Sequence, residues 1–160
     1  MAHCGHVTTD SDTPVPAVIR VVTPDDWREW RDLRLEALRE APHAFSATLA
    51  DWENAPEERW RQRLRGTHDL IADLDDRPAG MVTGFPRGDT VELGTLWVAP
   101  HARGRGVGDA LVRAVLGWAG HRTVTLRVAE ANTAATALYR RHGFEGTGRL
   151  EYQTKTSRRP

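Results

Sequence analysis

"LWVAPHARGRGVGDALV" (residues 96–112) places three glycines at alternate positions between a strand-like run and an apolar helical pattern. The first N–H groups of such a helix have no partner within it, and together with the helix dipole they form an anion receptor. Glycines at 104, 106 and 108 remove Cβ atoms, so a phosphate can approach the main chain and the chain can take positive φ angles. A flexible connector is the alternative interpretation. The apolar positions that predict the helix, closed by Gly120, are Val107, Ala110, Leu111, Ala114, Val115 and Trp118.

The spacing of these glycines distinguishes several kinds of phosphate loop. The Rossmann pattern Gly-x-Gly-x-x-Gly/Ala fails in both registers, because its third position falls on Asp109 or on Leu111. The P-loop pattern also fails, since no Gly-Lys-Ser/Thr follows. The stretch instead fits Arg-x-x-Gly-x-Gly, with Arg103, Gly106 and Gly108 at the defined positions.

The segments on either side of the glycines predict one mixed sheet. Residues 122–128 alternate as a strand, and the intervening helix makes a crossover that places this strand parallel to the one before the glycines. A last helix is predicted over 131–142, with Gly143 at its end. The fold class is therefore α/β, with helices flanking the sheet. An antiparallel meander is predicted upstream from three runs joined by tight turns: 68–74, 79–85 and 90–98.

The two ends of the chain complete this organisation. A strand over 18–23 precedes a helix from Thr23 to about Ala41, residues 42–49 are irregular, and 56–64 form a short helix with Trp60 and Leu64 on one face. The first of these helices is expected to bury Trp27, Trp30, Leu33 and Ala37.

After the last helix, Phe144 to about Thr156 predicts either one long strand or a cramped hairpin. We expect one domain over 18–156, with a disordered tail over 1–17 and a frayed end over 157–160.

Composition excludes several classes of partner. Twenty-two basic and 22 acidic residues leave a formal net charge of zero, so no bulk field favours nucleic acid or an anionic membrane. We find no signal peptide or membrane-spanning run and expect a cytoplasmic protein. Cys4 is the only cysteine, which excludes an internal disulfide. His3, Cys4 and His6 are an incidental cluster on the tail, and we expect no metal site.

Two motifs resemble those of one known family. The run from Leu96 to Val112 is similar to the acyl-CoA pyrophosphate motif of the GNAT superfamily of N-acetyltransferases. The resemblance is sharp over residues 90–145, and the order of elements agrees from residue 18 onward. It implies that the two parallel strands splay apart and admit the pantetheine arm of acetyl-CoA. The second signature, "NTAATALYRRHGF", supplies Asn132, Ala135, Leu138, Tyr139, Gly143 and Phe144.

The resemblance also implies where acetyl-CoA, the co-substrate, would bind. Arg103 and Arg105 would pair with phosphates, although exposed arginines beside a loop are commonly only solvated. Asn132 would contact the pantetheine arm, or it caps the helix that it starts. The full set of predicted cofactor-binding residues is Leu96, Trp97, Val98, Arg103, Gly104, Arg105, Gly106, Val107, Gly108, Asn132, Ala135 and Tyr139.

Amide formation from a thioester needs a base for the ammonium, whose reference pKa is about 10. Glu92 is the candidate, either directly or through a water relay, and an exposed strand carboxylate is the alternative interpretation. Strict alternation along this strand would place Glu92, Gly94, Leu96 and Val98 on one face.

Tyr139 is the candidate acid for the departing thiolate. Its phenol has a reference pKa of about 10, against about 8.5 for a thiol. On the last helix it shares a stripe with Asn132 and Ala135. A buried core tyrosine with a satisfied hydroxyl is the alternative.

These observations predict an acetyl-CoA-dependent N-acetyltransferase that acts by direct attack in a ternary complex, since no cysteine nucleophile is plausible. The acceptor is an unidentified primary amine, either a small molecule or a protein N-terminus or lysine. The alternatives are a catalytically silent CoA-binding sensor and a generic nucleotide-binding domain. We expect a monomer or homodimer. Acceptor contacts should come from residues 25–65, including "HAFSATL" with Phe45, Ser46 and Thr48, and from the C-terminal strands.

Overall fold

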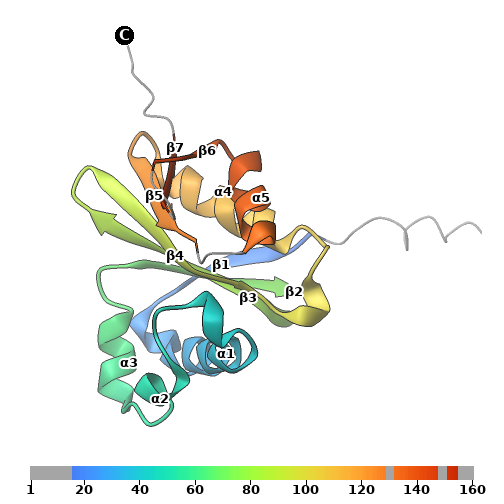
Figure 1. Ribbon diagram of the computed structural model, residues 1–160. Coiled ribbons are helices and arrows are strands. Elements are labelled where there is room, and N and C mark those ends of the chain that lie inside the picture. The colour runs from blue at the N-terminus through green and yellow to red at the C-terminus, as the bar shows by residue number, and fades with distance from the viewer. Residues whose placement is uncertain (1–15, 129–131, 148–150, 155–160) are drawn as a thin grey trace, which may run out of the picture.

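A computed structural model describes residues 16–128, 132–147 and 151–154 of the 160-residue chain. One sheet of seven strands runs through it in the order β1-β2-β3-β4-β5-β7-β6 (Figure 1). The strands are β1 (Val18–Val22), β2 (His68–Leu74), β3 (Arg77–Arg87), β4 (Thr90–Val98), β5 (Thr123–Arg127), β6 (Phe144–Gly146) and β7 (Glu151–Thr154). The predicted tail and the cluster of His3, Cys4 and His6 lie outside the described residues, apart from positions 16 and 17.

Helices cover both faces of the sheet (Figure 1). One face carries α1 (Trp27–Glu40), α2 (Leu49–Trp52) and α3 (Glu57–Arg63), and the other carries α4 (Val107–Ala119) and α5 (Thr133–Arg141). Short 3₁₀ turns lie at Pro24–Asp26, Pro42–Ala44 and Pro100–Ala102. None of the helices in the described ranges has the length and apolar character needed to cross a membrane.

The antiparallel meander and the parallel crossover are both confirmed. β1 to β4 pair antiparallel in chain order, and β5 pairs parallel with β4. The parallel pairing joins Thr90–Glu92 to Thr123–Thr125 and then ends, although β4 continues to Val98. The two strands therefore separate beyond Glu92, as the family resemblance implied.

The C-terminal segment forms a hairpin rather than one long strand. β6 and β7 pair antiparallel, and β7 lies between β6 and β5. Gly143, with φ of +88°, turns the chain out of α5 into β6.

Two hydrophobic clusters stabilise the two helical layers. Leu111, Val112 and Val115 of α4 pack on one face of the sheet. All four residues expected in the core of the first helix are buried, and they pack on the opposite face beside Trp60. Burial of each leucine or valine side chain in these clusters contributes roughly 1.5–3 kcal/mol.

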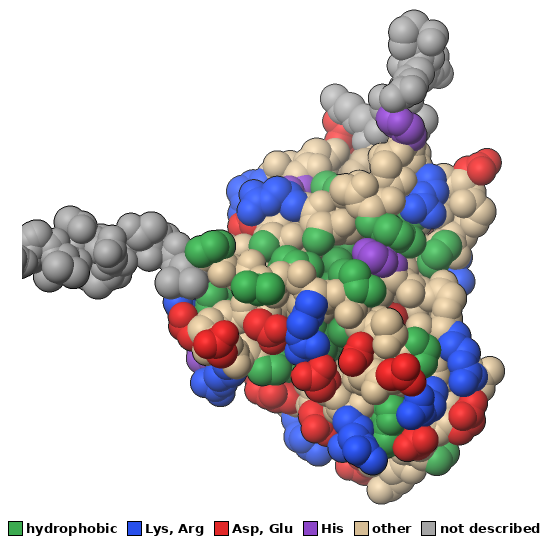
Figure 2. Space-filling view, turned by 180° about the vertical axis from the view of Figure 1, so that it is seen from behind, with side chains coloured by type: hydrophobic (Ala, Val, Ile, Leu, Met, Phe, Trp, Pro, Cys, Tyr) green, Lys and Arg blue, Asp and Glu red, His purple; other side chains and the backbone are tan. Residues whose placement is uncertain are grey.

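Over α1 to α3 the surface carries both signs of charge. Figure 2 shows basic and acidic side chains interspersed over the lower half of that view, which is the half that contains these helices in Figure 1. No continuous basic surface, of the kind that binds a phosphate backbone, forms on the face that Figure 2 displays.

The sequence analysis was wrong about one face of β4. Two residues of β4, Thr95 and Leu96, lie opposite a single residue of β3, and Thr95 takes a left-handed φ of 61°. This bulge shifts the alternation by one residue. Leu96 and Val98 consequently pack toward the α4 side, whereas Glu92 faces the side of α1 and α3.

A short helix, α2, begins at Leu49, the last residue of the segment 42–49 that was expected to be irregular. The sequence pattern did not predict this helix. Thr48 accepts a hydrogen bond from the Asp51 backbone N–H, and the Asp51 carboxylate accepts one from the Thr48 N–H. This reciprocal capping starts α2 at Leu49.

Candidate active site

The glycine loop leaves the N-terminus of α4 open. Gly104 and Gly106 have φ angles of +76° and +81°, and no atom lies within 4 Å of where their Cβ atoms would be. Gly106 is the N-cap residue of α4, so no side chain caps the helix. The first N–H groups of α4 therefore remain available to an anion.

The third glycine of the loop, Gly108, is required for helix packing rather than for a positive φ angle. A Cβ atom at Gly108 would lie 3.2 Å from Cδ2 of Leu138 and 3.7 Å from Cγ2 of Val98. Gly108 thus allows α5 to approach α4 closely, and its φ is not positive. Helix packing, rather than access of a phosphate, explains the missing side chain at this position.

The predicted cofactor residues gather around one cavity of about 650 Å³, which we call the glycine-loop cavity. Arg105 and Tyr139 are the only predicted members that do not line it. Arg105 instead pairs with Asp75 at 3.2 Å. The predicted residues that line the cavity are Leu96, Trp97, Val98, Arg103, Gly104, Gly106, Val107, Gly108, Asn132 and Ala135.

Arg103 connects the glycine loop to the end of α1. Its Nη2 donates to the Glu40 carboxylate at 2.8 Å, and its Nε donates to the Val98 carbonyl at 3.1 Å. The same Glu40 oxygen accepts a hydrogen bond from the Trp97 indole at 2.9 Å. Arg103 and Trp97 together hold the pKa of Glu40 below its ordinary value.

Arg141 is a cavity residue that the sequence analysis missed. It lies in the last turn of α5 and donates to both carboxylate oxygens of Asp109 at 3.2 Å. His142 contacts the same carboxylate at 2.8 Å. Burial of Asp109 opposes its charge, but the hydrogen bonds from His142 and Arg141 outweigh burial and lower its pKa. The position of Arg141, two residues after Tyr139 in the second motif, was the available signal.

Asn132 caps α5, in agreement with the alternative interpretation of that residue. Its Oδ1 accepts from the Ala135 N–H at 3.1 Å. Because Asn132 also lines the glycine-loop cavity, a capping role and a ligand contact are compatible.

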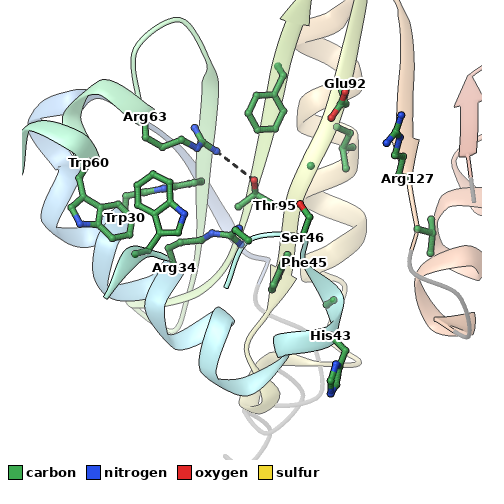
Figure 3. Close-up of a pocket in the computed structure, with 17 residues that line it drawn as sticks. Trp30, Arg34, His43, Phe45, Ser46, Trp60, Arg63, Glu92, Thr95 and Arg127 are labelled. Carbon is green, nitrogen blue, oxygen red and sulfur yellow. Dashed lines mark hydrogen bonds between the residues drawn. The ribbon is translucent and has the colours of Figure 1, made fainter. Parts of the chain in front are cut away.

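A second cavity, of about 570 Å³, opens on the α1 to α3 side, and we call it the aromatic cavity (Figure 3). Phe45 and Ser46 line it as expected, whereas Thr48 caps α2 instead. Ala44 lines both cavities, and Thr95 in this wall is followed directly by Leu96 in the other. The two cavities are therefore neighbours, with the β4 bulge between them. Aromatic rings in the wall come from Trp30, Phe45, Trp52, Trp60 and Phe85.

A buried polar network supports the bulge. Asp69 is fully buried and accepts hydrogen bonds from Thr67, from Thr83 at 2.7 Å and from Arg63 at 3.2 Å. Arg63 also donates to the Thr95 hydroxyl at 3.4 Å. The network joins α3, the bend before β2, β2, β3 and β4, so hydrophobic periodicity carries no signal for it.

Glu92 lies on the border of the aromatic cavity. Among the described residues that line this cavity, Glu92 is the one carboxylate. It also lines a smaller cavity of about 230 Å³ against β5 and β7. Figure 3 shows it on β4, opposite Arg127 of β5. Glu92 therefore lies where the two parallel strands begin to separate.

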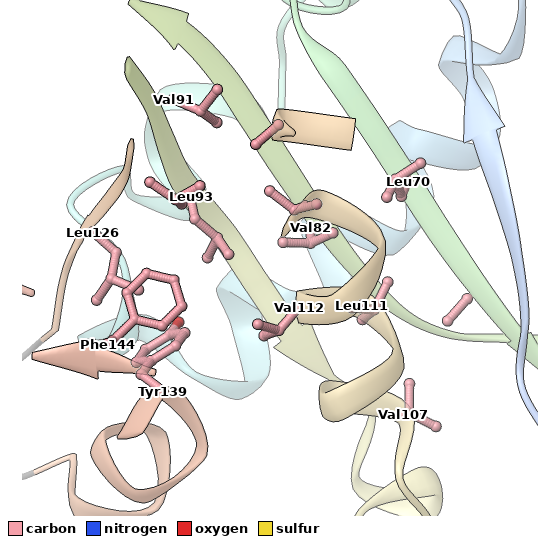
Figure 4. Close-up of a cluster of buried hydrophobic side chains, with 14 of the residues drawn as sticks. Leu70, Val82, Val91, Leu93, Val107, Leu111, Val112, Leu126, Tyr139 and Phe144 are labelled. Atoms are coloured by element: carbon pink, nitrogen blue, oxygen red, sulfur yellow. The ribbon is translucent and has the colours of Figure 1, made fainter. Parts of the chain in front are cut away.

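Tyr139 lies in the hydrophobic cluster on the α4 side (Figure 4). Its ring is 6% exposed and packs edge to face against Phe144, with ring centroids 5.5 Å apart. Burial raises the pKa of the phenol well above its ordinary value. The phenol is therefore fully protonated near neutral pH.

Comparison with known proteins connects this geometry to a family. Residues 26–144 match the sequence profile of the Acetyltransferase (GNAT) family. This match covers more than half of the chain. The chain belongs to the GNAT family.

The alignment with this chain covers different shares of its individual GNAT relatives. Mycothiol acetyltransferase of Clavibacter sepedonicus is 33% identical over 82% of this chain and 43% of its own. Aminoglycoside N(6')-acetyltransferase type 1 of Stenotrophomonas maltophilia is 31% identical over 84% of this chain and 90% of its own. The chain spans about half the length of several curated relatives that it matches.

Solved GNAT structures share the fold. The PaiA N-acetyltransferase of Thermoplasma acidophilum, in complex with coenzyme A, superposes with a TM-score of 0.71. It is 16% identical, and the match covers 88% of this chain and 99% of that one.

Proposed function

We propose that this GNAT chain transfers an acetyl group from acetyl-CoA to a primary amine by direct attack in a ternary complex. The observation that carries this proposal is that two cavities lie next to each other on either side of the β4 bulge. One has an open helix N-terminus for a phosphorylated donor, and the other has a carboxylate for an amine. Relatives named mycothiol acetyltransferase and aminoglycoside N(6')-acetyltransferase support the same reaction class.

The donor would bind mainly through backbone groups. The open N-terminus of α4 would accept the pyrophosphate, with Arg103 and Arg141 at the cavity wall. In the described residues, no strand pairs with the β5-facing edge of β4 beyond Glu92. Apart from the Val98 carbonyl, which accepts from Arg103, the backbone of Leu96 to Val98 on this edge would hydrogen-bond the pantetheine arm as an added strand would.

On the acceptor side, the amine must lose a proton before it attacks. An alkylammonium has a reference pKa of about 10, so Glu92 would take this proton directly or through a water molecule. The neutral nitrogen then attacks the thioester carbonyl carbon and the C–S bond breaks. The nitrogen loses its second proton to become the amide, and this proton balances the one that the departing CoA thiolate takes up. A backbone N–H between Leu96 and Val98 would stabilise the oxyanion.

For Tyr139, the proposed role is hydrogen-bond donation to the departing sulfur. Its raised pKa keeps the hydroxyl protonated, but it disfavours complete transfer of that proton to a thiolate whose parent thiol has a pKa of about 8.5. Tyr139 lines neither cavity. In this role its ring would stay in the hydrophobic cluster on the α4 side, and only its hydroxyl group would reach the sulfur.

A thiol-release assay with acetyl-CoA and a panel of amines tests the function. We expect release that depends on the amine, and initial-rate patterns that intersect as a ternary complex requires. Parallel, ping-pong patterns would contradict direct attack. Binding of CoA without thiol release for any amine would support the sensor alternative instead.

A further inference from the structure

Arg34 is the feature of the aromatic cavity that the proposed reaction does not use. Its side chain extends from α1 toward the loop that carries Phe45 and Ser46 (Figure 3). The guanidinium carbon lies 4.4 Å from the centre of the Phe45 ring. Its Nη1 is buried and has no hydrogen-bond partner in the described part of the chain, and Arg34 forms no ion pair there.

A second arginine nearby makes the unpaired charge of Arg34 energetically less favourable. Arg63 lines the same cavity and is already neutralised by the fully buried Asp69. Desolvation first, and the charge of Arg63 second, lower the pKa of Arg34 to about 10. Arg34 is thus still a cation at neutral pH. A buried charge without a counter-ion is unfavourable, and an anionic group of a ligand would relieve it.

A second buried donor without a partner belongs to the same wall. Within the described residues, only Arg34 Nη1 and Trp60 Nε1 are buried side-chain N or O atoms that lack a hydrogen bond. Both residues line the aromatic cavity, and both atoms are donors. The wall therefore contains two buried donors without a partner, and a ligand with acceptor oxygens that reached them would satisfy them.

The charged groups of the wall also have an order in space. In Figure 3, Glu92 lies at the upper end of the cavity, and Arg34 lies between α1 and the Phe45 loop. Arg127, the remaining basic side chain near Glu92, is 81% exposed and faces Glu151 at 3.7 Å. A polycationic acceptor would be repelled by the positive charge of Arg34. A molecule with an amine at one end and an anion at the other would match both groups.

We propose that the acceptor is a small amine that also carries a carboxylate, and that Arg34 binds this carboxylate. This inference rests on the proposed function, since it assigns the acceptor of the same reaction. The guanidinium presents its N–H donors in a planar fork that fits the two carboxylate oxygens. The ring of Phe45 and the tryptophans of the wall provide an apolar surface for the body of the acceptor.

Phenylalanine and phenylalaninamide form a matched pair of probes, with kanamycin as a polycationic aminoglycoside. The amide lacks the carboxylate and has the less basic amine, so any difference in basicity favours the amide. We expect kcat/KM for phenylalanine to exceed that for the amide by at least about tenfold, as one charge-assisted hydrogen-bonded pair contributes. Equal values, or a preference for kanamycin, would overturn the inference while leaving the acetyltransferase function intact.

Variants assign this preference to Arg34. Arg34→Gln should raise KM for phenylalanine roughly 10- to 100-fold and leave KM for the amide nearly unchanged. Arg34→Lys should give an intermediate KM, because it keeps the charge and loses the fork. Arg39→Gln is the control, since Arg39 is an exposed arginine of the same helix that lines neither cavity.

Two further measurements separate the possible failures. Arg34→Gln should melt at a temperature no lower than that of the unsubstituted protein, because it removes an unpaired buried charge. A clear fall in Tm would mean that Arg34 is structural and would overturn the inference.

If no amine releases thiol, the proposed function fails, and calorimetric titration of phenylalanine in the presence of CoA still tests the site. Arg34-dependent binding would support it, and its absence would overturn it.

Discussion

The glycine-loop cavity and the aromatic cavity are built from different kinds of group. The first uses backbone N–H groups at the start of α4 and the edge of β4 beyond Glu92, where no described strand pairs, and has no side chains at Gly104 and Gly106. The second uses aromatic rings, Arg34 and Glu92, which come from separate elements. Under the proposed function, backbone groups would bind a feature that all acyl-CoA donors share, whereas the side chains of the aromatic cavity would determine which acceptor is used.

The largest expected effect concerns Asp69, which supports the border between the two cavities. Asp69→Asn removes the carboxylate that neutralises Arg63 and should lower the free energy of unfolding by about 3–5 kcal/mol. Urea denaturation measures this change. Asp25→Asn is the matched control, because Asp25 is 90% exposed in its pair with Arg61 and should cost at most about 1 kcal/mol. Equal losses in both variants would show that the network does not support the border.

Next in size is the effect of Glu92 on catalysis. Glu92→Gln should lower kcat about 100-fold, as expected for loss of a general base, and leave KM for acetyl-CoA unchanged. Steady-state thiol release measures both constants. Glu36→Gln, at an exposed position of α1 outside both cavities, should leave kcat unchanged. A normal kcat in Glu92→Gln would assign proton removal to another group.

On the other side of the comparison, Gly106→Ala tests the backbone site. A side chain at φ of +81° should cost roughly 1–2 kcal/mol of stability and weaken CoA binding. Denaturation and calorimetric titration with CoA measure the two effects. Gly117→Ala in the same helix has open space and no positive φ, and should stabilise the protein by about 0.5–1 kcal/mol. Unchanged CoA affinity in Gly106→Ala would remove the glycine loop from the donor site.

The smallest expected effect concerns Glu40, which joins α1 to the glycine loop. Its pKa is lowered in the folded state, so its contribution is fully present above its ordinary value of 4.5. That contribution is lost as the pH falls through the folded-state pKa. Glu40→Gln should therefore lower Tm slightly at pH 7, and the difference from the unsubstituted protein should shrink at pH 3. A difference that is independent of pH would exclude the charge of Glu40 as its cause.

Much of the donor side could be predicted from the sequence. Adjacent residues such as Arg103 to Gly108 remain adjacent in space, and the apolar stripe that begins at Val107 requires a helix after them. The prediction was wrong for β4, where a local backbone conformation interrupts the two-residue alternation of side chains. Thr95 takes a left-handed φ, so Leu96 leaves the face that carries Glu92. A single bulge has no signature in the hydrophobic pattern.

The sequence by itself determined the order of elements, the crossover of β4 and β5 and the open start of α4, because these depend on local periodicity and on glycine. Only the tertiary structure decided which side chains line the aromatic cavity. Arg34, Arg63 and Glu92 are up to 58 residues apart in the chain and lie around one cavity because α1 and α3 pack on the same face of the sheet. That packing leaves Arg34 Nη1 buried without a hydrogen-bond partner among the described residues, and no local pattern in the sequence indicates it.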